Sequence, residues 1–346
     1  MQRYKSKRQG GRKVRKLLNH PDAAVKEMVE GVLLAHGDYL CALPGHPRAL
    51  VRASLGSDKV GIVIGGGSGH EPAFLGYVGR GMADGVALGN IFAAPAPGPI
   101  VEAARAVHRG KGVLLIYGNY SGDIMNFEMA AELLQMEGIA VRGVVVNDDI
   151  ASASKEEREK RRGIAGEIMV YKLAGAAAEL GMSLDETAAI AQKAVDNTMS
   201  MGAAWSPCSL PQTGRPSFVL NEDEMEIGLG VHGEPGVKKV GMLSADDLAK
   251  EMVAAFAQEN SGSFGDIAVL VNGLGSTSMM ELHILYRALH KELTSVGALI
   301  RKALVGEFIT SLEMGGCSIT VIHLDEELLQ LLREPCDALG WTQCAR

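Results

Sequence analysis

The segment Val60-Gly-Ile-Val-Ile-Gly-Gly-Gly-Ser-Gly-His-Glu-Pro72 joins a short β-branched run to four glycines in five positions. This pattern is typical of a buried strand that leads into a tight turn. Glycine has no Cβ, so the backbone of such a turn can approach a ligand closely. His70 follows at once, which makes the turn a candidate ligand site. A second histidine with small neighbours, His232, lies in Gly228-Leu-Gly-Val-His-Gly-Glu-Pro-Gly236.

The glycine turn does not match the usual nucleotide-binding patterns. G-x-G-x-x-G fails from Gly65, where the last position is His70, and from Gly67, where it is Pro72. The pattern G-x-x-x-x-G-K-[ST] occurs nowhere in the chain. We therefore expect neither a Rossmann nor a P-loop nucleotide site. A plain tight turn is the weaker interpretation of so dense a glycine cluster.

The rest of the chain alternates apolar runs of about five residues with helical patterns, which predicts two α/β domains with mixed or parallel sheets flanked by helices. We expect a boundary near residue 197, with the ligand site in a first domain (17–197) and His232 in a second (198–346). The stretch 199–237, rich in Pro, Gly and Ser, predicts loops and a β-ribbon between the two units that folds back over the first sheet. The expected strands are Gly61–Ile64, Val113–Tyr117, Val141–Asn147, Ile267–Asn272 and Ser318–Leu324, and the expected helices are Pro21–His36, Asn126–Glu137, Ile164–Leu180 and Leu184–Asp196.

Charge and cysteine usage narrow the functional classes. Residues 1–16 carry eight Lys or Arg and no acid, which predicts a disordered basic tail; without these eight charges the net charge of −7 becomes −15. So acidic a body argues against nucleic acid as the partner. No apolar run approaches the length of a membrane span. Five dispersed cysteines without C-x-x-C spacing argue against a disulfide framework and a zinc site, and indicate a reducing cytoplasm.

Several further motifs permit two interpretations each. Asp123 follows the strand 113–117, where it could be a general base or only a helix N-cap. Asn147-Asp-Asp149 could hold a metal but is better explained as a strand-end turn. Asn272-Gly-Leu-Gly-Ser-Thr-Ser278 could bind an anion or be a plain turn. Glu222-Asp-Glu-Met-Glu226 predicts a solvated acidic loop, and the other seven histidines carry no context that suggests catalysis.

Taken together, these motifs resemble the dihydroxyacetone kinase K subunit family over about residues 16–341. The resemblance lies in Gly-Gly-Gly-Ser-Gly-His-Glu-Pro, Asn-Tyr-Ser-Gly-Asp-Ile-x-Asn-Phe-Glu and His-Gly-Glu-Pro-Gly, in that order. Three shorter motifs also match: Arg161-Arg-Gly163, Pro216-Ser-Phe218 and Thr310-Ser-Leu-Glu-Met314.

The resemblance implies a homodimeric, ketose-binding subunit of a two-component kinase. It implies no nucleotide on this chain: ATP or ADP with Mg²⁺ would sit on a separate L-type subunit or domain. The phosphoryl group would come from that ATP, or from a phosphotransferase-system protein through the L subunit. A non-catalytic ketose sensor that regulates transcription is the alternative, because the family includes such paralogues.

Residue roles carried over by motif form a compact set. His232 would add through its imidazole nitrogen to the substrate carbonyl carbon and form a covalent hemiaminal, a bond that glycerol cannot make. Asp123 would be the general base for the terminal hydroxyl, and His70 its hydrogen-bonding companion. The implied substrate-binding residues are Gly66, Gly67, Ser68, Gly69, Gly118 and Asn119, with no metal ligand.

Two positions depart from the family pattern. Many members have Lys where this chain has Gly118, and Thr or Ser often follows the Ile-Phe pair where Ile91-Phe-Ala-Ala-Pro95 has alanines. Loss of a long side chain would make room for a larger ketose. A four-carbon ketose such as erythrulose is therefore a candidate substrate beside dihydroxyacetone.

Overall fold

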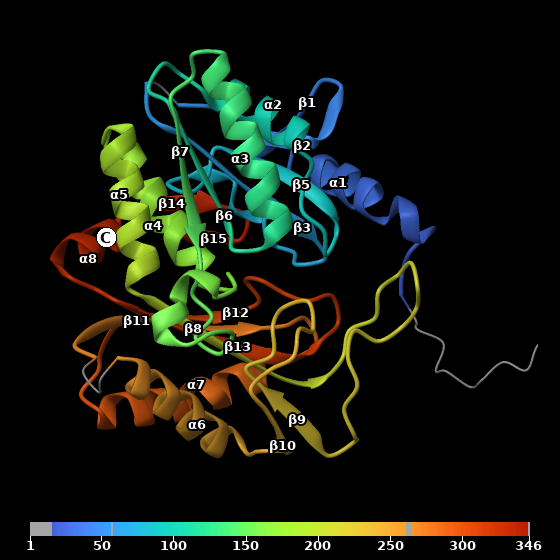
Figure 1. The fold of residues 1–346 in the computed structure, drawn as a ribbon, viewed down its shortest axis with the longest axis vertical. Helices are drawn as coiled ribbons and strands as arrows, with labels where there is room; N and C mark the ends of the chain where they lie inside the picture. The colour runs from blue at the N-terminus through green and yellow to red at the C-terminus, as the bar shows by residue number, and fades with distance from the viewer. Residues whose placement is uncertain (1–15, 57, 261–263, 345–346) are drawn as a thin grey trace, which may run out of the picture.

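The computed structural model describes residues 16–56, 58–260 and 264–344. The expected basic tail lies outside them, except for Lys16. Two six-stranded mixed sheets, one above the other in Figure 1, carry helices on their faces, and a three-stranded sheet lies beside the first. The predicted fold class, two α/β units with mixed sheets flanked by helices, is confirmed.

The first sheet has the order β1-β2-β5-β3-β6-β7. Strands β5, β3, β6 and β7 run parallel; β2 pairs antiparallel with β5, and β1 pairs antiparallel with β2. Helices α2 and α3 cover one face, and α4 and α5 the other. The bounds are β1 Leu40–Leu43, β2 His46–Arg52, β3 Gly61–Ser68, β5 Gly85–Ile91, β6 Val113–Gly118, β7 Val141–Val146, α1 Ala24–Ala35, α2 Pro97–Val107, α3 Ser121–Met136, α4 Glu167–Glu179 and α5 Leu184–Asp196, with 3₁₀ turns at Pro21–Ala23, Leu75–Tyr77 and Lys155–Lys160.

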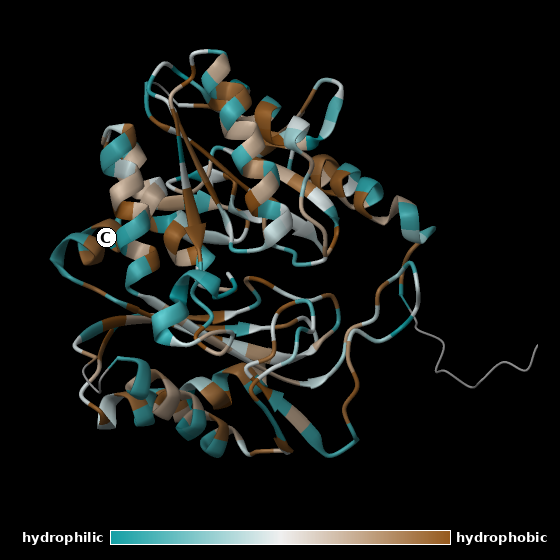
Figure 2. Cartoon of the chain, viewed as in Figure 1, coloured by the Kyte–Doolittle hydropathy of each residue, from teal (hydrophilic) through white to brown (hydrophobic). Residues whose placement is uncertain are grey.

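The second sheet has the order β10-β9-β8-β13-β11-β12 and is antiparallel except for the β11–β12 pair. Helices α6 and α7 cover its outer face. Its inner face packs against α4, which is buried between the two sheets. Figure 2 shows both hydrophilic and hydrophobic residues along helices α5 and α6, as expected for helices with one face buried and one face exposed. The bounds are β8 Thr198–Ser206, β9 Glu224–Ile227, β10 Lys238–Gly241, β11 Asp266–Gly273, β12 Leu299–Gly306, β13 Gly315–His323, α6 Ala245–Glu259 and α7 Met279–Ser295.

The C-terminal segment returns to the first half of the chain. Strand β14 (Cys336–Ala338) pairs with β4 (Gly79–Arg80) and with β15 (Trp341–Gln343). Helix α8 (Glu326–Arg333) and Trp341 join the core that contains α4. The division at residue 197 stays a prediction, and these last residues pack on the side of the first sheet.

The expected elements are present, and their ends shift by a few residues; three differences are larger or change the interpretation. Strand β3 continues through the glycine run to Ser68, because the neighbouring chain is so close that a Cβ on Gly65 would overlap the Ala87 carbonyl. Helix α3 begins at Ser121, five residues before the expected start. The interpretation of 199–237 as loops and ribbon was wrong for its first part, since β8 is a strand inside the second sheet. Strand β8 consists largely of small residues and methionines, so its sequence shows no clear strand pattern.

Two further findings bear on expectations from the sequence, one on membrane spans and one on a glycine-rich turn. Among the described residues, none of the helices is both long and apolar enough to span a membrane. Ser183 and Ser278 each form a capping box, with Glu186 and Glu281 respectively. The second means that the Asn272–Ser278 turn caps its own helix.

Candidate functional site

His70 lies in the turn that ends β3, and the fold holds it in one orientation. Its imidazole is 3% exposed, and its Nδ1 lies 2.6 Å from the carbonyl oxygen of Thr310, in the segment after β12. The ring of Phe92 stacks on it with centroids 4.8 Å apart. Gly69, just before it, has φ +97°, a conformation that only glycine adopts without strain. The glycine turn therefore aims His70 at the second half of the chain.

His232 reaches the same place from the loop after β9. Its Nε2 lies 3.0 Å from His70 Nε2. Glu234 fixes its ring, because one carboxylate oxygen lies 2.8 Å from His232 Nδ1 and the other accepts the His232 backbone N–H at 2.9 Å. Ser311 donates its hydroxyl proton to the carbonyl of Val231 and so anchors the loop. The expected return of the His232 segment to the first sheet is what the structure shows.

The hydrogen bonds of the two histidines define where their protons lie. The Thr310 carbonyl and the Glu234 carboxylate only accept, so both Nδ1 atoms carry protons. The Nε2–Nε2 contact then needs one more proton, because two lone pairs would otherwise face each other. The histidine pair thus holds three ring protons and one positive charge.

Burial decides which ring holds that charge. Burial and then the nearby His232 lower the pKa of His70 to about 3, so His70 is neutral. The ring of His232 lies beside the carboxylate of Glu234, which is placed to balance a positive charge on it. Burial opposes ionisation of that carboxyl group, but the hydrogen bond from His232 and its charge lower the pKa of Glu234 to about 2.

Asp123 lies in the first turn of α3 and is not its N-cap. Tyr120 holds the N-cap position and makes no side-chain cap. The Asp123 carboxyl group is 8% exposed, and its Oδ1 has no hydrogen-bond partner among the described residues. Burial raises the pKa of Asp123 to about 7, partly offset by the charge of His232. An acceptor that titrates near neutrality and has a free oxygen suits a general base.

The three predicted reactive residues line one cavity. Of the six predicted substrate-binding residues, the structure brings Gly66, Gly67 and Gly118 to this cavity. The full lining is Gly65, Gly66, Gly67, His70, Phe74, Gly118, Tyr120, Asp123, Gly163, Ile164, Glu167, Val231, His232 and Ile309.

Ser68, Gly69 and Asn119 do not reach this cavity. Ser68 donates its hydroxyl proton to the carbonyl of Gly89 at 2.9 Å. Asn119 donates to the carbonyls of Glu159 and Arg161 at 2.7 and 2.6 Å. The motif resemblance predicted that Ser68 and Asn119 bind substrate, but their side chains hydrogen-bond to the backbone and stabilise the fold.

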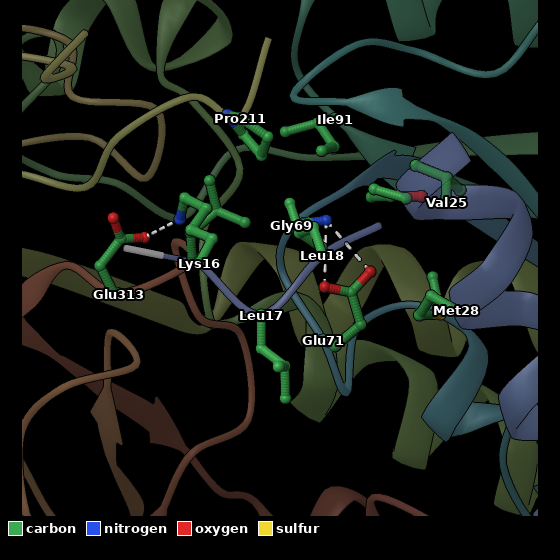
Figure 3. Close-up of a pocket in the computed structure, with 13 residues that line it drawn as sticks. Lys16, Leu17, Leu18, Val25, Met28, Gly69, Glu71, Ile91, Pro211 and Glu313 are labelled. Atoms are coloured by element: carbon green, nitrogen blue, oxygen red, sulfur yellow. Dashed lines mark hydrogen bonds and ion pairs between the residues drawn. The ribbon is translucent and has the colours of Figure 1, made fainter. Parts of the chain in front are cut away.

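Gly69 belongs to a second, apolar pocket behind the turn, shown in Figure 3. Its amide donates to both oxygens of Glu71, at 3.0 and 3.1 Å. Lys16 pairs with Glu313 at the edge of this pocket. The turn thus has the cavity of His70, Asp123 and His232 on one side and an apolar pocket on the other, lined also by Leu17, Leu18, Ala24, Val25, Met28, Ser68, Ile91, Pro211 and Leu312.

Two acidic residues of the site were not selected from the sequence. Glu234 lies within the quoted His-Gly-Glu-Pro motif, so its place two residues after His232 could have indicated it. Glu167 lies on α4 and carried no such signal. It is 3% exposed, and its Oε2 accepts a hydrogen bond from Tyr171.

Glu167 lies close to Gly118 and so affects how much space this glycine leaves in the cavity. A Cβ built on Gly118 would lie 2.5 Å from Glu167 Oε1, and one on Gly163 would lie 2.9 Å from it. The space beside Gly118 is therefore filled by a carboxyl group. The expectation that a missing side chain makes room for a larger ketose stays a prediction, and Glu167 Oε1 lies close to where a side chain on residue 118 would begin.

The adjacent acidic motif is structural. Asp148 accepts from the backbone amides of Ile164 and Gly166, both at 2.8 Å. The carboxylate of Asp149 pairs with Arg162, whose guanidinium also donates to the carbonyl of Gly228 at 3.0 Å. The described residues contain no group of three or more His, Cys, Asp or Glu side chains placed to hold a metal. The strand-end turn therefore anchors the segment that carries His232.

Comparison with known proteins agrees with the geometry. Residues 30–340 match the Dak1 domain. The chain belongs to the Dak1 family. It is 43% identical over 330 residues to the dihydroxyacetone-binding subunit DhaK of PTS-dependent dihydroxyacetone kinase 1 from Listeria innocua, and the match covers 95% of this chain and 100% of that protein. The resemblance stated from the motifs is thus confirmed.

Two other members of the Dak1 family mark its functional range. The L-erythrulose kinase of Pectobacterium atrosepticum is 42% identical; the match covers 93% of this chain and 55% of that protein. The structure of the dihydroxyacetone kinase operon co-activator Dha-DhaQ superposes with a TM-score of 0.86 at 35% identity, covering 92% of this chain and 98% of that one. The expected enzyme class, phosphotransferases with an alcohol acceptor, is that of the kinase relatives.

Proposed function

We propose that this chain is the ketose-binding subunit of a dihydroxyacetone-type kinase, and that His232 holds the ketose as a covalent hemiaminal. The observation that carries the proposal is the convergence of His232, His70 and Asp123 on one buried cavity. In a Dak1 member, such a set suits a carbonyl substrate that also presents a hydroxyl group to a base.

The proton arrangement supports the covalent step. As a ketose enters, the proton on His232 Nε2 passes to His70 Nε2, and the freed lone pair attacks the carbonyl carbon. The π electrons of the carbonyl move to oxygen, which takes the proton from His70. The Nδ1 proton stays on the hydrogen bond to Glu234, so the alkylated imidazolium keeps its counter-ion. Every proton is accounted for, and His70 ends neutral.

Phosphoryl transfer is the second step of the proposal. Asp123 takes the proton from a terminal hydroxyl as its oxygen attacks the phosphorus of the donor. The donor is ATP with Mg²⁺ on an L-type partner subunit, or a phosphotransferase-system phosphoryl protein acting through that partner. The chain itself works as a cytoplasmic homodimer. Dihydroxyacetone and erythrulose are the substrates proposed.

Intact-protein mass spectrometry under native conditions tests the adduct. The chain incubated with dihydroxyacetone or erythrulose should gain the full mass of one ketose, with no loss of water. His232→Ala should show no gain, and His283→Ala, an exposed histidine, serves as the matched control. An adduct that persists in His232→Ala would refute the assignment.

The alternative, a ketose sensor, is favoured by the likeness to the Dha-DhaQ co-activator. A sensor needs His232 but has no use for the free oxygen of Asp123. A coupled assay with the cognate L-type partner, ATP or a phosphotransferase donor, and both ketoses distinguishes the two. If the chain forms the adduct but neither donor phosphorylates any ketose, the sensor function replaces the kinase.

A further inference from the structure

Glu167 and Tyr120 are polar side chains of the cavity without a role in the proposed reaction, and the Glu167 carboxyl group lies nearer to the Gly118 wall. It projects from α4, the helix buried between the two sheets. Its Oε2 is occupied by the hydroxyl of Tyr171, whereas its Oε1 has no hydrogen-bond partner among the described residues. A carboxyl oxygen left unpaired in so buried a place carries a free-energy penalty unless a ligand or water meets it.

The walls of the cavity leave that oxygen accessible. The nearest neighbours of Oε1 include the backbones of Gly118 and Gly163, neither of which has a side chain to cover it. The remaining walls near it are apolar, formed by Phe74, Ile164 and Ile309. Glu167 thus provides a polar contact on a surface that is otherwise formed by apolar side chains, backbone and Tyr120.

A count of polar groups indicates what this contact serves. Dihydroxyacetone has one carbonyl and two hydroxyls. In the proposed function, His232 binds the carbonyl carbon and Asp123 with His70 binds the transferred hydroxyl. The backbone of Gly66 and Gly67 remains for the second hydroxyl. A four-carbon ketose has a third hydroxyl, and Glu167 and Tyr120 are the polar cavity side chains left to bind it; of these, only Glu167 offers a carboxyl oxygen against the Gly118 backbone.

We propose that Glu167 contacts the ketose and determines specificity, by hydrogen-bonding the additional hydroxyl of a four-carbon ketose through Oε1. This inference rests on the proposed function and names its substrate class. Selection then depends on hydrogen bonding and not on pocket size, because the carboxyl group occupies the space beside Gly118.

The protonation of Glu167 supports this role. Burial raises the pKa of Glu167 well above its usual range, although the hydrogen bond from Tyr171 opposes the shift. Tyr171 occupies Oε2, so Oε1 is the oxygen left to meet a substrate hydroxyl. Glutamine has a similar shape and can also hydrogen-bond both Tyr171 and that hydroxyl.

Calorimetric titration of the purified chain with dihydroxyacetone and with both enantiomers of erythrulose tests the inference. Glu167→Ala should weaken binding of the preferred erythrulose by about tenfold or more and change dihydroxyacetone affinity far less. Glu167→Gln, the matched control, should keep the ratio of the two affinities. Gly118→Ala should shift that ratio in the same direction as Glu167→Ala, because its Cβ would displace Oε1.

The outcomes distinguish a failure of this inference from a failure of the proposed function. If both ketoses bind and the affinity ratio is the same in Glu167→Ala and Gly118→Ala as in the unmodified chain, the specificity role is overturned and the ketose function stands. If the unmodified chain binds no ketose, the proposed function fails and the inference with it. Should Glu167→Ala fold poorly, judged by its melting temperature, the Gly118→Ala ratio decides.

Discussion

His70 Nε2 and His232 Nε2 lie 3.0 Å apart, although 162 positions separate the two residues. The contact joins the turn after β3 to the loop after β9, and each histidine is held by a group from the second half of the chain. Thr310 accepts from His70, and Glu234 accepts from His232. The reactive pair therefore forms only when both sheets have packed around α4.

The protonation of Asp123 predicts how phosphoryl transfer depends on pH. Its pKa of about 7, raised from 3.8 by burial, means that the base form accumulates as pH rises through 7. We expect kcat to rise with pH along a limb centred near 7. Steady-state rates with saturating ketose and L-type partner, from pH 5.5 to 8.5, measure this limb.

Asp123→Asn provides the control for that limb. It should lose about 10²–10⁴-fold in kcat and show no limb, while the ketose adduct still forms. The raised pKa also stabilises the fold at low pH, and this contribution is lost as pH rises through 7. A limb that survives in Asp123→Asn would assign the titration to another group.

Glu234 is predicted to be a positioning residue for His232. Glu234→Ala removes both the Nδ1 acceptor and the acceptor of the His232 amide. We expect ketose affinity to fall by about 10- to 100-fold, since hydrogen bonds to charged groups contribute about 1.5–3 kcal/mol. Calorimetric titration measures the loss.

Glu222→Ala, in the exposed turn before β9, should bind ketose as the unmodified chain does. The prediction of a solvated acidic loop over 222–226 was wrong beyond this turn, because residues 224–226 belong to β9 and pair within the second sheet. Glu234→Gln keeps an acceptor without the charge and should lie between the two. Equal affinity in Glu234→Ala and the unmodified chain would show that His232 needs no orienting carboxylate.

Gly66 is predicted to be required for packing as well as for ligand approach. A Cβ at this position would overlap the ring of Phe74. Gly66→Ala should lower the free energy of unfolding by about 1–3 kcal/mol. Gly98, exposed on α2, has nothing within 4 Å of a Cβ, so Gly98→Ala should be neutral or stabilising by about 0.4–1 kcal/mol. Urea unfolding of both variants measures the difference, and equal stabilities would refute the close approach.

Arg162 is predicted to stabilise the loop that carries His232. It pairs with Asp149, whose side chain is 0% exposed, and also binds the carbonyl of Gly228. Arg162→Ala leaves a buried carboxylate unpaired and should lower the free energy of unfolding by about 3–5 kcal/mol.

Arg287→Ala is the matched control for Arg162→Ala, because its ion pair with Asp246 is exposed. It should change stability by less than about 0.5 kcal/mol. Chemical unfolding followed by circular dichroism compares them. Similar small losses in both variants would mean that Asp149 finds another partner.

The elements that could be predicted from the sequence are those with a clear local hydrophobic pattern. The alternation of apolar runs and helical periods placed five strands and four helices, with β3 extended further because its glycines let neighbouring backbones approach. Strand β8 was not predicted, because its small residues and methionines show no clear period between two helical regions. Motif resemblance correctly brought together His70, Asp123 and His232 in one cavity. It also selected Ser68 and Asn119, whose polar groups bind the scaffold.

The amino-acid sequence by itself determined the α/β class and the Dak1 family and predicted the reactive side chains, because spacing and residue type carry those properties along the chain. Only the tertiary structure decided what these groups can do. It placed Glu167 against Gly118, gave His232 its carboxylate partner, and buried Asp123 enough to bring its pKa near neutrality. Contact and desolvation depend on what surrounds a group in three dimensions, and most of those neighbours are distant in the sequence.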